Sequence, residues 1–121
     1  TDQVKNHIIE TIKDDRITVE AVRNINEPSK VSDYTSNAYM IIQKTIKQLY
    51  PNIVVSPGLI SGGTDTKHYA NISENAYRFV PISINEKNKT GFHGINEHIS
   101  SKNYIKIVQF YYQFIQNLNI K

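Results

Sequence analysis

Among the side chains of this 121-residue sequence, the four histidines are the ones best suited to bind a metal ion. His7 lies in a segment with helical spacing and His98 lies close to a helix start, so both are expected to face solvent or cap a helix. His93 stands in Gly91-Phe92-His93-Gly94, where flanking glycines let the backbone turn tightly and the imidazole project into a cleft. The alternative is a histidine in an ordinary strand-to-helix loop, and one histidine alone favours that alternative.

A catalytic zinc site needs about three ligands from the protein. The sequence has no His-x-Asp pair, no adjacent Glu-Glu pair and no His-Glu-x-x-His segment. A metal ion at His93 would therefore need ligands from outside this segment.

A second candidate is the turn Ser61-Gly62-Gly63-Thr64-Asp65. Glycines before a helix start expose backbone N–H groups, which suit a carboxylate, a phosphate or an oxyanion, and Lys67 or His68 would add positive charge. The stretch matches neither the phosphate-binding P-loop nor the dinucleotide fingerprint. A tight turn with Thr64 as helix N-cap is an equally good interpretation, so both stay open.

The sequence predicts no catalytic side chain within these 121 residues. No serine or lysine stands out as an activated nucleophile, and no pair of carboxylates has the spacing of an acid–base couple. Asp14 and Asp15 are expected to form a solvated helix end. The tyrosines of the last helical segment, such as Tyr104 and Tyr111, have a spacing that indicates packing rather than base stacking.

Hydrophobic periodicity predicts the elements that would position these residues. Apolar residues at helical spacing indicate helices, and alternating or β-branched runs indicate strands. The predicted helices are 2–13, 33–50, 64–72 and 100–118, and the predicted strands are 16–23, 53–55 and 76–84. Turn-forming residues at 24–32 predict a hinge.

Beyond the hinge, helices alternate with strands, which predicts an α/β fold with helices packed on a sheet. Two short strands cannot form a convincing sheet alone. We therefore expect most of the sheet to come from outside this sequence or from another copy of the chain.

Composition excludes several classes of function. Fourteen lysines and arginines against eleven acidic residues give a net charge of +3, and they are scattered, so no nucleic-acid partner is predicted. The absence of cysteine excludes disulfides and thiolate metal sites. No apolar run approaches the roughly 20 residues that span a bilayer. The first residues read as a helix start rather than a signal peptide, as expected for a piece of a longer protein.

Two stretches together resemble a family signature. Gly62-Gly63-Thr64-Asp65-Thr66-Lys67-His68-Tyr69 resembles the Gly-Gly-Thr-Asp-Ser-Arg-Tyr type sequence of zinc-dependent amidohydrolases. Tyr77-Arg78-Phe79-Val80-Pro81, followed by Phe92-His93-Gly94-Ile95-Asn96-Glu97-His98-Ile99, resembles their downstream Arg-Phe-x-Pro and His-Gly-x-Asn-Glu-Arg-Ile motifs. The family is peptidase family M20, which includes aminoacylase, carboxypeptidase S and the desuccinylases, and the match is closest to its carboxypeptidase S branch.

The resemblance implies a domain plan. In such proteins a catalytic α/β domain with two zinc ions is interrupted by a smaller α+β lid domain that often dimerises. Residues 1–23 would then be the last helix and strand of the lid, 24–32 the hinge, and 33–121 the C-terminal part of the catalytic domain. A homodimer is a possible partner state.

The resemblance also implies site residues. His93 matches the last zinc ligand, while Gly62, Gly63 and Thr64 match a loop that lines the substrate pocket. Lys67 stands where the family usually has arginine, and His98 stands where it has arginine or lysine, so the charge preference for substrate is open because lysine cannot form a bidentate clamp. The other zinc ligands, the general-base glutamate and a lid histidine would precede this segment.

The implied function is hydrolysis of the amide bonds of N-acyl amino acids or of peptide C-termini, by an enzyme of which this segment alone is inactive. The alternative is a non-catalytic module that self-associates or binds a partner. Its basis is the incomplete predicted sheet and the tyrosine-rich last helix, because unpaired strand edges invite pairing between chains.

Overall fold

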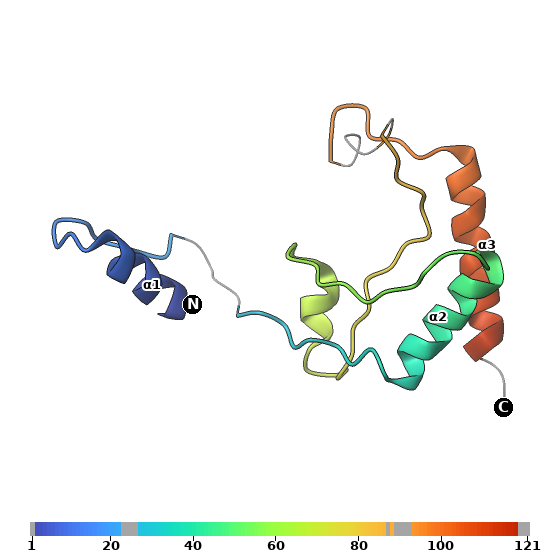
Figure 1. Cartoon of the computed structure of the whole chain (residues 1–121), viewed down its shortest axis with the longest axis horizontal. Helices are drawn as coiled ribbons and strands as arrows, with labels where there is room; N and C mark the ends of the chain where they lie inside the picture. Colours follow the sequence, from blue (N-terminus) through green and yellow to red (C-terminus); the bar gives the residue numbers. More distant parts are fainter. Residues whose placement is uncertain (1, 23–26, 87, 89–92, 119–121) are drawn as a thin grey trace. The chain divides into compact units, whose positions relative to one another are not determined.

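Four helical segments make up the regular structure of this computed structural model, which describes residues 2–22, 27–86, 88 and 93–118 (Figure 1). They are α1 (Asp2–Ile12), α2 (Asn37–Leu49), the 3₁₀ helix η1 (Asp65–Tyr69) and α3 (Ser101–Leu118). The chain divides into an N-terminal unit, residues 1–30, and a C-terminal unit, residues 31–121. Within the described ranges, no helix combines the length and apolar character needed to cross a bilayer.

The predicted α/β fold class is wrong for this structure. None of the described residues in the predicted strands 16–23, 53–55 and 76–84 forms a strand, so no sheet is present among them. The backbone groups that a ladder would pair are used in other ways. Ile17 N and Ile53 N donate within local turns, while Ala76 N and Ser83 N donate to side chains. Alternating hydrophobicity makes a strand only when a second strand supplies hydrogen-bond partners.

In the N-terminal unit, α1 ends where predicted, within one residue. Lys13 follows the helix with φ 50° and its N–H donates to Ile9 O at 3.0 Å, which is the left-handed helix ending usually made by glycine. Asp14 then pairs with Arg16 through its side chain, at 2.7 Å for the Nη2–Oδ2 contact. The Arg16 side chain and backbone donors lower the pKa of Asp14.

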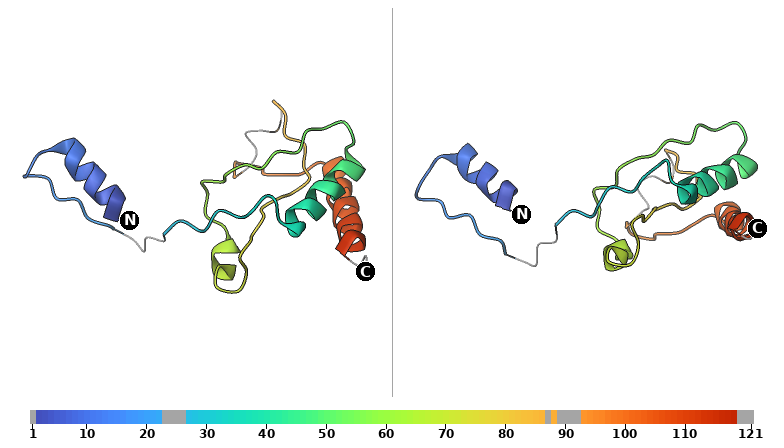
Figure 2. Two further views of the ribbon diagram at one scale, coloured as in Figure 1. Left: turned by 60° about the horizontal axis from the view of Figure 1, so that its bottom comes forward. Right: turned by 90° about the horizontal axis from the view of Figure 1, so that it is seen from below.

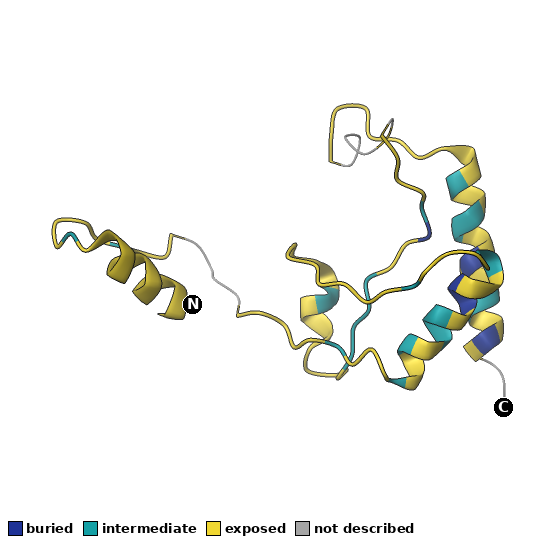
Figure 3. Ribbon diagram, in the orientation of Figure 1, coloured by how far each residue is buried: buried dark blue, intermediate teal, exposed yellow. Residues whose placement is uncertain are grey.

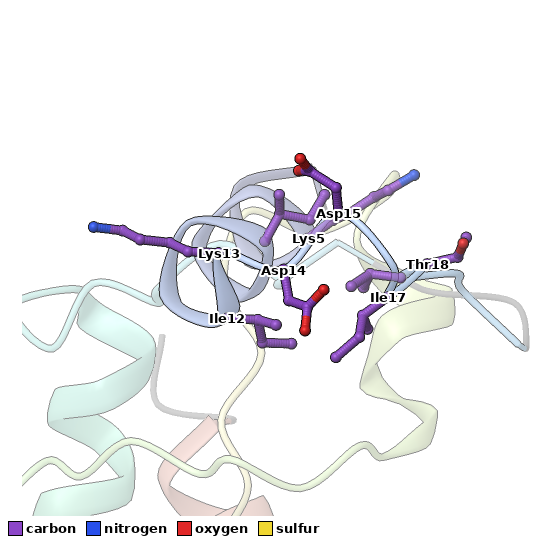
Figure 4. Close-up of a pocket in the computed structure, with 9 residues that line it drawn as sticks. Lys5, Ile12, Lys13, Asp14, Asp15, Ile17 and Thr18 are labelled. Carbon is purple, nitrogen blue, oxygen red and sulfur yellow. The ribbon is translucent and has the colours of Figure 1, made fainter.

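A hollow of about 360 Å³ lies between α1 and the segment that follows it (Figure 4). Ile12 and Ile17 point towards each other across it, whereas Lys13 points away. None of the residues predicted to bind metal or substrate lines this hollow. The hollow is therefore no support for the predicted site.

In the C-terminal unit, α2 begins later than the predicted residue 33 because a polar turn precedes it. Asp33 Oδ1 accepts hydrogen bonds from the Thr35 hydroxyl and the Thr35 N–H, both at 2.7 Å. These bonds, that of the hydroxyl first, lower the pKa of Asp33. Ser36 is the N-cap and its hydroxyl accepts from Tyr39 N at 3.2 Å. A side chain that caps in this way fixes the first turn of the helix.

The helices α2 and α3 pack against each other and form the core of this unit (Figure 1 and Figure 2). The buried large apolar side chains are Ile46 and Phe110, and they are accompanied by the buried polar residues Thr45 and Asn117 (Figure 3). The Phe110 ring lies 5.0 Å from the Phe79 ring, between centroids. The helix predicted for 100–118 is confirmed, but its apolar stripe is not the buried face: Phe110 and Asn117 are the buried residues of α3. Most of the predicted stripe stays exposed, namely Tyr104, Val108, Tyr111, Ile115 and Leu118.

Asn117 is the polar link of this core. Its amide nitrogen donates to Thr45 Oγ1 and to Gln48 Oε1, both at 2.8 Å, and the Thr45 hydroxyl donates to Ile41 O at 2.8 Å. Asn117 Oδ1 also accepts a bond from Gln113 Nε2 within α3, at 3.4 Å. A buried amide with satisfied donors fixes the register of the two helices more tightly than apolar contact alone.

A second set of contacts, here called the clasp, joins residues 32–36 to residues 75–77. The Ser32 hydroxyl accepts from Ala76 N at 2.9 Å, and Asp33 N donates to Asn75 Oδ1 at 2.7 Å. The Tyr77 hydroxyl donates to Asp33 O, so it accepts from the Ser36 hydroxyl. The clasp anchors the extended segment 75–78 at the start of α2.

Replacing Asn117 by alanine is expected to loosen the helix pair. The substitution leaves the Gln48 and Thr45 oxygens without their buried donor, a loss of about 1–3 kcal/mol. Hydrogen exchange by mass spectrometry should show amides of α2 and α3 exchanging roughly tenfold faster or more. Asn71→Ala, at an exposed asparagine, is the matched control. Equal exchange in the two variants would show that Asn117 does not hold the helices together.

Candidate functional site

The turn that leads into η1 carries three of the predicted site residues, Gly62, Gly63 and Thr64, and η1 itself carries the fourth, Lys67. Thr64 is the N-cap of η1, with φ −143° and ψ 171°, and its hydroxyl accepts from Thr66 N at 3.3 Å. Lys67 N donates to Thr64 O at 3.2 Å, which closes the first helical turn. The capping role predicted for Thr64 is confirmed, while η1 ends at Tyr69 rather than at residue 72.

The two glycines of this turn are not required by the local fold. None of the described glycines has a positive φ, so the backbone conformation at Gly62 and Gly63 is open to other residues. A Cβ atom added at Gly63 would meet nothing within 4 Å, and one at Gly62 would meet only Ile60 Cγ2 at 3.9 Å. The missing side chains leave the backbone of the turn accessible from outside.

Arg78 holds the turn in place, a role that the sequence analysis does not predict. Its Nε donates to Thr64 Oγ1 and Thr66 Oγ1, both at 2.8 Å, and its Nη2 donates to Thr66 Oγ1 at 2.6 Å. Arg78 and Thr66 are both half-buried. The signal was present in Tyr77-Arg78-Phe79-Val80-Pro81, where an arginine interrupts a run of aromatic and apolar residues.

His93 lies in a separate, exposed turn. Its φ is 58° and that of Asn96 is 60°, left-handed conformations for which histidine and asparagine are enriched among non-glycine residues. Two residues further on, the His98 ring nitrogen Nδ1 contacts Asn96 O at 2.7 Å. The predicted helix start at residue 100 is confirmed within one residue, because α3 begins at Ser101.

The described residues do not form a metal site by themselves. In no place do they bring together three or more histidine, aspartate or glutamate side chains close enough to hold an ion. His93 can offer one imidazole, whereas even an open catalytic zinc site needs about three protein ligands. The structure therefore gathers the Gly62–Lys67 turn with Arg78, but it gathers no set of ligands around His93.

A small apolar hollow of about 120 Å³ lies elsewhere in the same unit. Its walls are one aliphatic and five aromatic side chains: Ile42, Tyr77, Phe79, Phe110, Tyr111 and Phe114. It contains no charged side chain, so it resembles an imperfectly filled core more than a polar site.

Comparison with known proteins extends these observations. The family described as peptidase family M20/M25/M40 matches residues 3–117. A Dictyostelium discoideum protein named "Probable carboxypeptidase S-like 2" is 39% identical over 97% of this chain and 22% of its own length. The mouse "N-fatty-acyl-amino acid synthase/hydrolase PM20D1" is 40% identical over 88% of this chain and 22% of its own length. Saccharomyces cerevisiae carboxypeptidase S is 35% identical over 77% of this chain and 18% of its length.

No solved structure matches the chain. The chain spans about a fifth of the length of the curated relatives it matches. The matched residues include the Gly62–Lys67 turn, Arg78 and His93. With a family match over residues 3–117 and relatives at 35–40% identity, the chain belongs to peptidase family M20/M25/M40 and has hydrolases as its relatives.

Proposed function

We propose that this chain supplies part of the substrate pocket to an enzyme that hydrolyses the amide bonds of N-acyl amino acids or of peptide C-termini. The names of the mouse and yeast relatives support these two substrate classes. The observation that carries the proposal is the turn at Gly62–Thr64, whose glycines the local fold does not require and whose threonine is held by Arg78. A backbone kept bare of side chains is suited to close approach by a ligand.

In this proposal Gly62, Gly63, Thr64 and Lys67 contact the substrate. Thr64 is exposed, and Lys67 lies one helical turn further along η1. Lys67 would attract a carboxylate as a point charge without the fixed geometry of an arginine fork. N-acyl amino acids and peptide C-termini both have a free carboxylate, and a lysine side chain would attract that negative charge.

The domain assignment is part of the same proposal. Residues 1–23 belong to a lid domain, 24–32 form a hinge and 33–121 belong to the catalytic domain. The division of the chain after residue 30 supports a boundary in this region. The assignment of each side to the lid or the catalytic domain depends on the motif order.

For the metal, we propose that His93 gives one ligand to a two-zinc site whose remaining ligands lie outside this sequence. Members of the family are generally metal-dependent. The exposed position of His93 supports a role as a ligand, because ligands from outside this sequence can reach an imidazole at the surface. The described residues alone do not fit a complete site.

His93→Ala in the full-length protein is expected to abolish hydrolysis with little effect on folding. Truncating an exposed side chain leaves no large cavity, while a metal site that lacks one imidazole loses affinity. Activity, bound zinc by elemental analysis and the thermal unfolding midpoint are the measurements. His7→Ala, at an exposed histidine of α1, is the control and should match the wild type. Full activity and full zinc content in His93→Ala would remove His93 from the site.

The isolated 121-residue chain is expected to bind zinc weakly and to have no hydrolase activity. Tight binding requires several deprotonated ligands at once, and the described residues offer no such group. Calorimetric titration of zinc into the chain and into its His93→Ala variant measures this directly. Tight, stoichiometric binding that depends on His93 would mean that the chain assembles a complete site by itself or between copies.

A non-catalytic, self-associating module is the second candidate, and one observation favours it. α3 carries apolar side chains that stay more than half exposed: Tyr104, Ile105, Val108, Tyr112, Ile115 and Leu118. Exposed apolar surface of this kind marks a contact with another protein surface. Light scattering coupled to size exclusion tests it, because a monomer at high concentration in the isolated chain would argue against self-association.

A further inference from the structure

The guanidinium of Arg78 is the centre of a small polar cluster with Thr64 and Thr66. Three donor–acceptor distances of 2.6–2.8 Å join it to the two hydroxyls, and the hydroxyls themselves lie 2.6 Å apart. The Nε–H is shared between both oxygens, while Nη2 is directed at Thr66 alone. The planar fork of arginine thus fixes two side chains of the turn at once.

Among the described residues of the C-terminal unit, no acidic side chain forms an ion pair with Arg78. The described residues place no carboxylate within ion-pairing distance of it, although the side chain is half-buried. Its partners are neutral hydroxyls, so the hydrogen bonds are charge-assisted from one side only. Neutral hydroxyl groups do not neutralise the charge of a half-buried guanidinium. The positive charge of Arg78 can therefore still attract an anionic or carbonyl oxygen.

The hydroxyl groups of Thr64 and Thr66 have a hydrogen-bond donor that the cluster itself does not use. A threonine hydroxyl donates one hydrogen and accepts at two lone pairs. Thr64 Oγ1 accepts from Thr66 N and from Arg78 Nε, and Thr66 Oγ1 accepts from Arg78 Nε and Nη2. At most one of the two hydroxyl hydrogens can lie between the two oxygens. At least one hydroxyl hydrogen is therefore left to donate to an acceptor oxygen outside the cluster.

The anchor of Arg78 comes from the clasp. The preceding residue, Tyr77, bonds to Asp33 and Ser36, and Ala76 bonds to Ser32. The backbone that carries Arg78 is thereby tied to the start of α2. The contacts run without a break from α2 through Tyr77 and Arg78 to the exposed turn.

We propose that Arg78 is a positioning residue for substrate binding. It acts through Thr64 and Thr66: it fixes their hydroxyls so that the spare hydrogen and the bare Gly62–Gly63 backbone meet a carboxylate or carbonyl oxygen of the substrate. The inference rests on the proposed function, because it takes the turn to be part of the substrate pocket. Arg78 itself contacts the threonines and need not touch the reacting atoms.

The test compares Arg78→Met, Arg78→Lys, Thr66→Val and the double variant Arg78→Met/Thr66→Val in the full-length protein. The substrate is an N-fatty-acyl amino acid, and KM, kcat and the thermal midpoint are measured. Arg78→Met should raise KM about tenfold and change kcat by less than about threefold, as expected when a charge-assisted hydrogen bond is lost. Arg78→Lys, which keeps the charge without the fork, should give an intermediate KM.

The double variant separates positioning from direct contact. If Arg78 acts through the threonines, adding Thr66→Val to Arg78→Met should raise KM by less than about twofold, because the two changes remove the same constraint. Arg16→Met is the matched control, because Arg16 is an exposed arginine whose partner is Asp14. It should leave KM, kcat and the midpoint unchanged.

The outcomes distinguish this inference from the proposed function. If the wild type hydrolyses neither N-acyl amino acids nor peptides, the proposed function fails and the inference fails with it. If the wild type is active and Arg78→Met keeps its KM, or only lowers the thermal midpoint, the inference alone is overturned. Should Arg78→Met not fold, Arg78→Lys and Thr66→Val decide, since a KM unchanged in both also overturns it.

Discussion

The hydroxyl of Tyr77 is the interaction on which the C-terminal unit depends. It joins the turn before α2 to the extended segment that carries Arg78 and the adjacent Phe79. Towards one side this segment reaches the polar turn at Thr64, and towards the other it reaches the aromatic core at Phe110. Because few apolar side chains are buried, such directed hydrogen bonds determine the path of the chain to an unusual extent.

The sequence predicted the helices well and the strands poorly, and the reason is physical. A helix satisfies its own backbone, so local signals such as the Ser36 cap and the apolar stripe of α3 are enough to locate it. A strand depends on a neighbour that local sequence does not specify. Residues 76–84 have the composition of a strand, yet Ser32 and Asn103 side chains take the hydrogen bonds of Ala76 and Ser83.

At the candidate site too, features set by neighbouring residues are predictable from the sequence, whereas contacts between residues far apart in the chain are not. Thr64 as an N-cap was readable from its position before a short helix, and the structure confirms it. The role of Arg78 is not predictable in the same way. Its partners Thr64 and Thr66 lie 14 and 12 positions away, and no helix or strand periodicity relates them to it. The motif order around His93 pointed to the right family, whereas a set of metal ligands cannot be derived from one histidine.

The three polar links of the C-terminal unit also suggest an order of assembly during folding. Arg78 and Thr64 are 14 residues apart, Tyr77 and Asp33 are 44 apart, and Asn117 and Thr45 are 72 apart. The entropy lost on closing a loop grows with the logarithm of its length, so the shortest loop closes at the least cost. The Thr64–Arg78 loop overlaps the Asp33–Tyr77 loop in all but its last residue, so closing the shorter loop also shortens the search that closes the longer one. Loop entropy alone therefore favours early closure of the turn at the candidate site over the long-range bond that links α2 to α3.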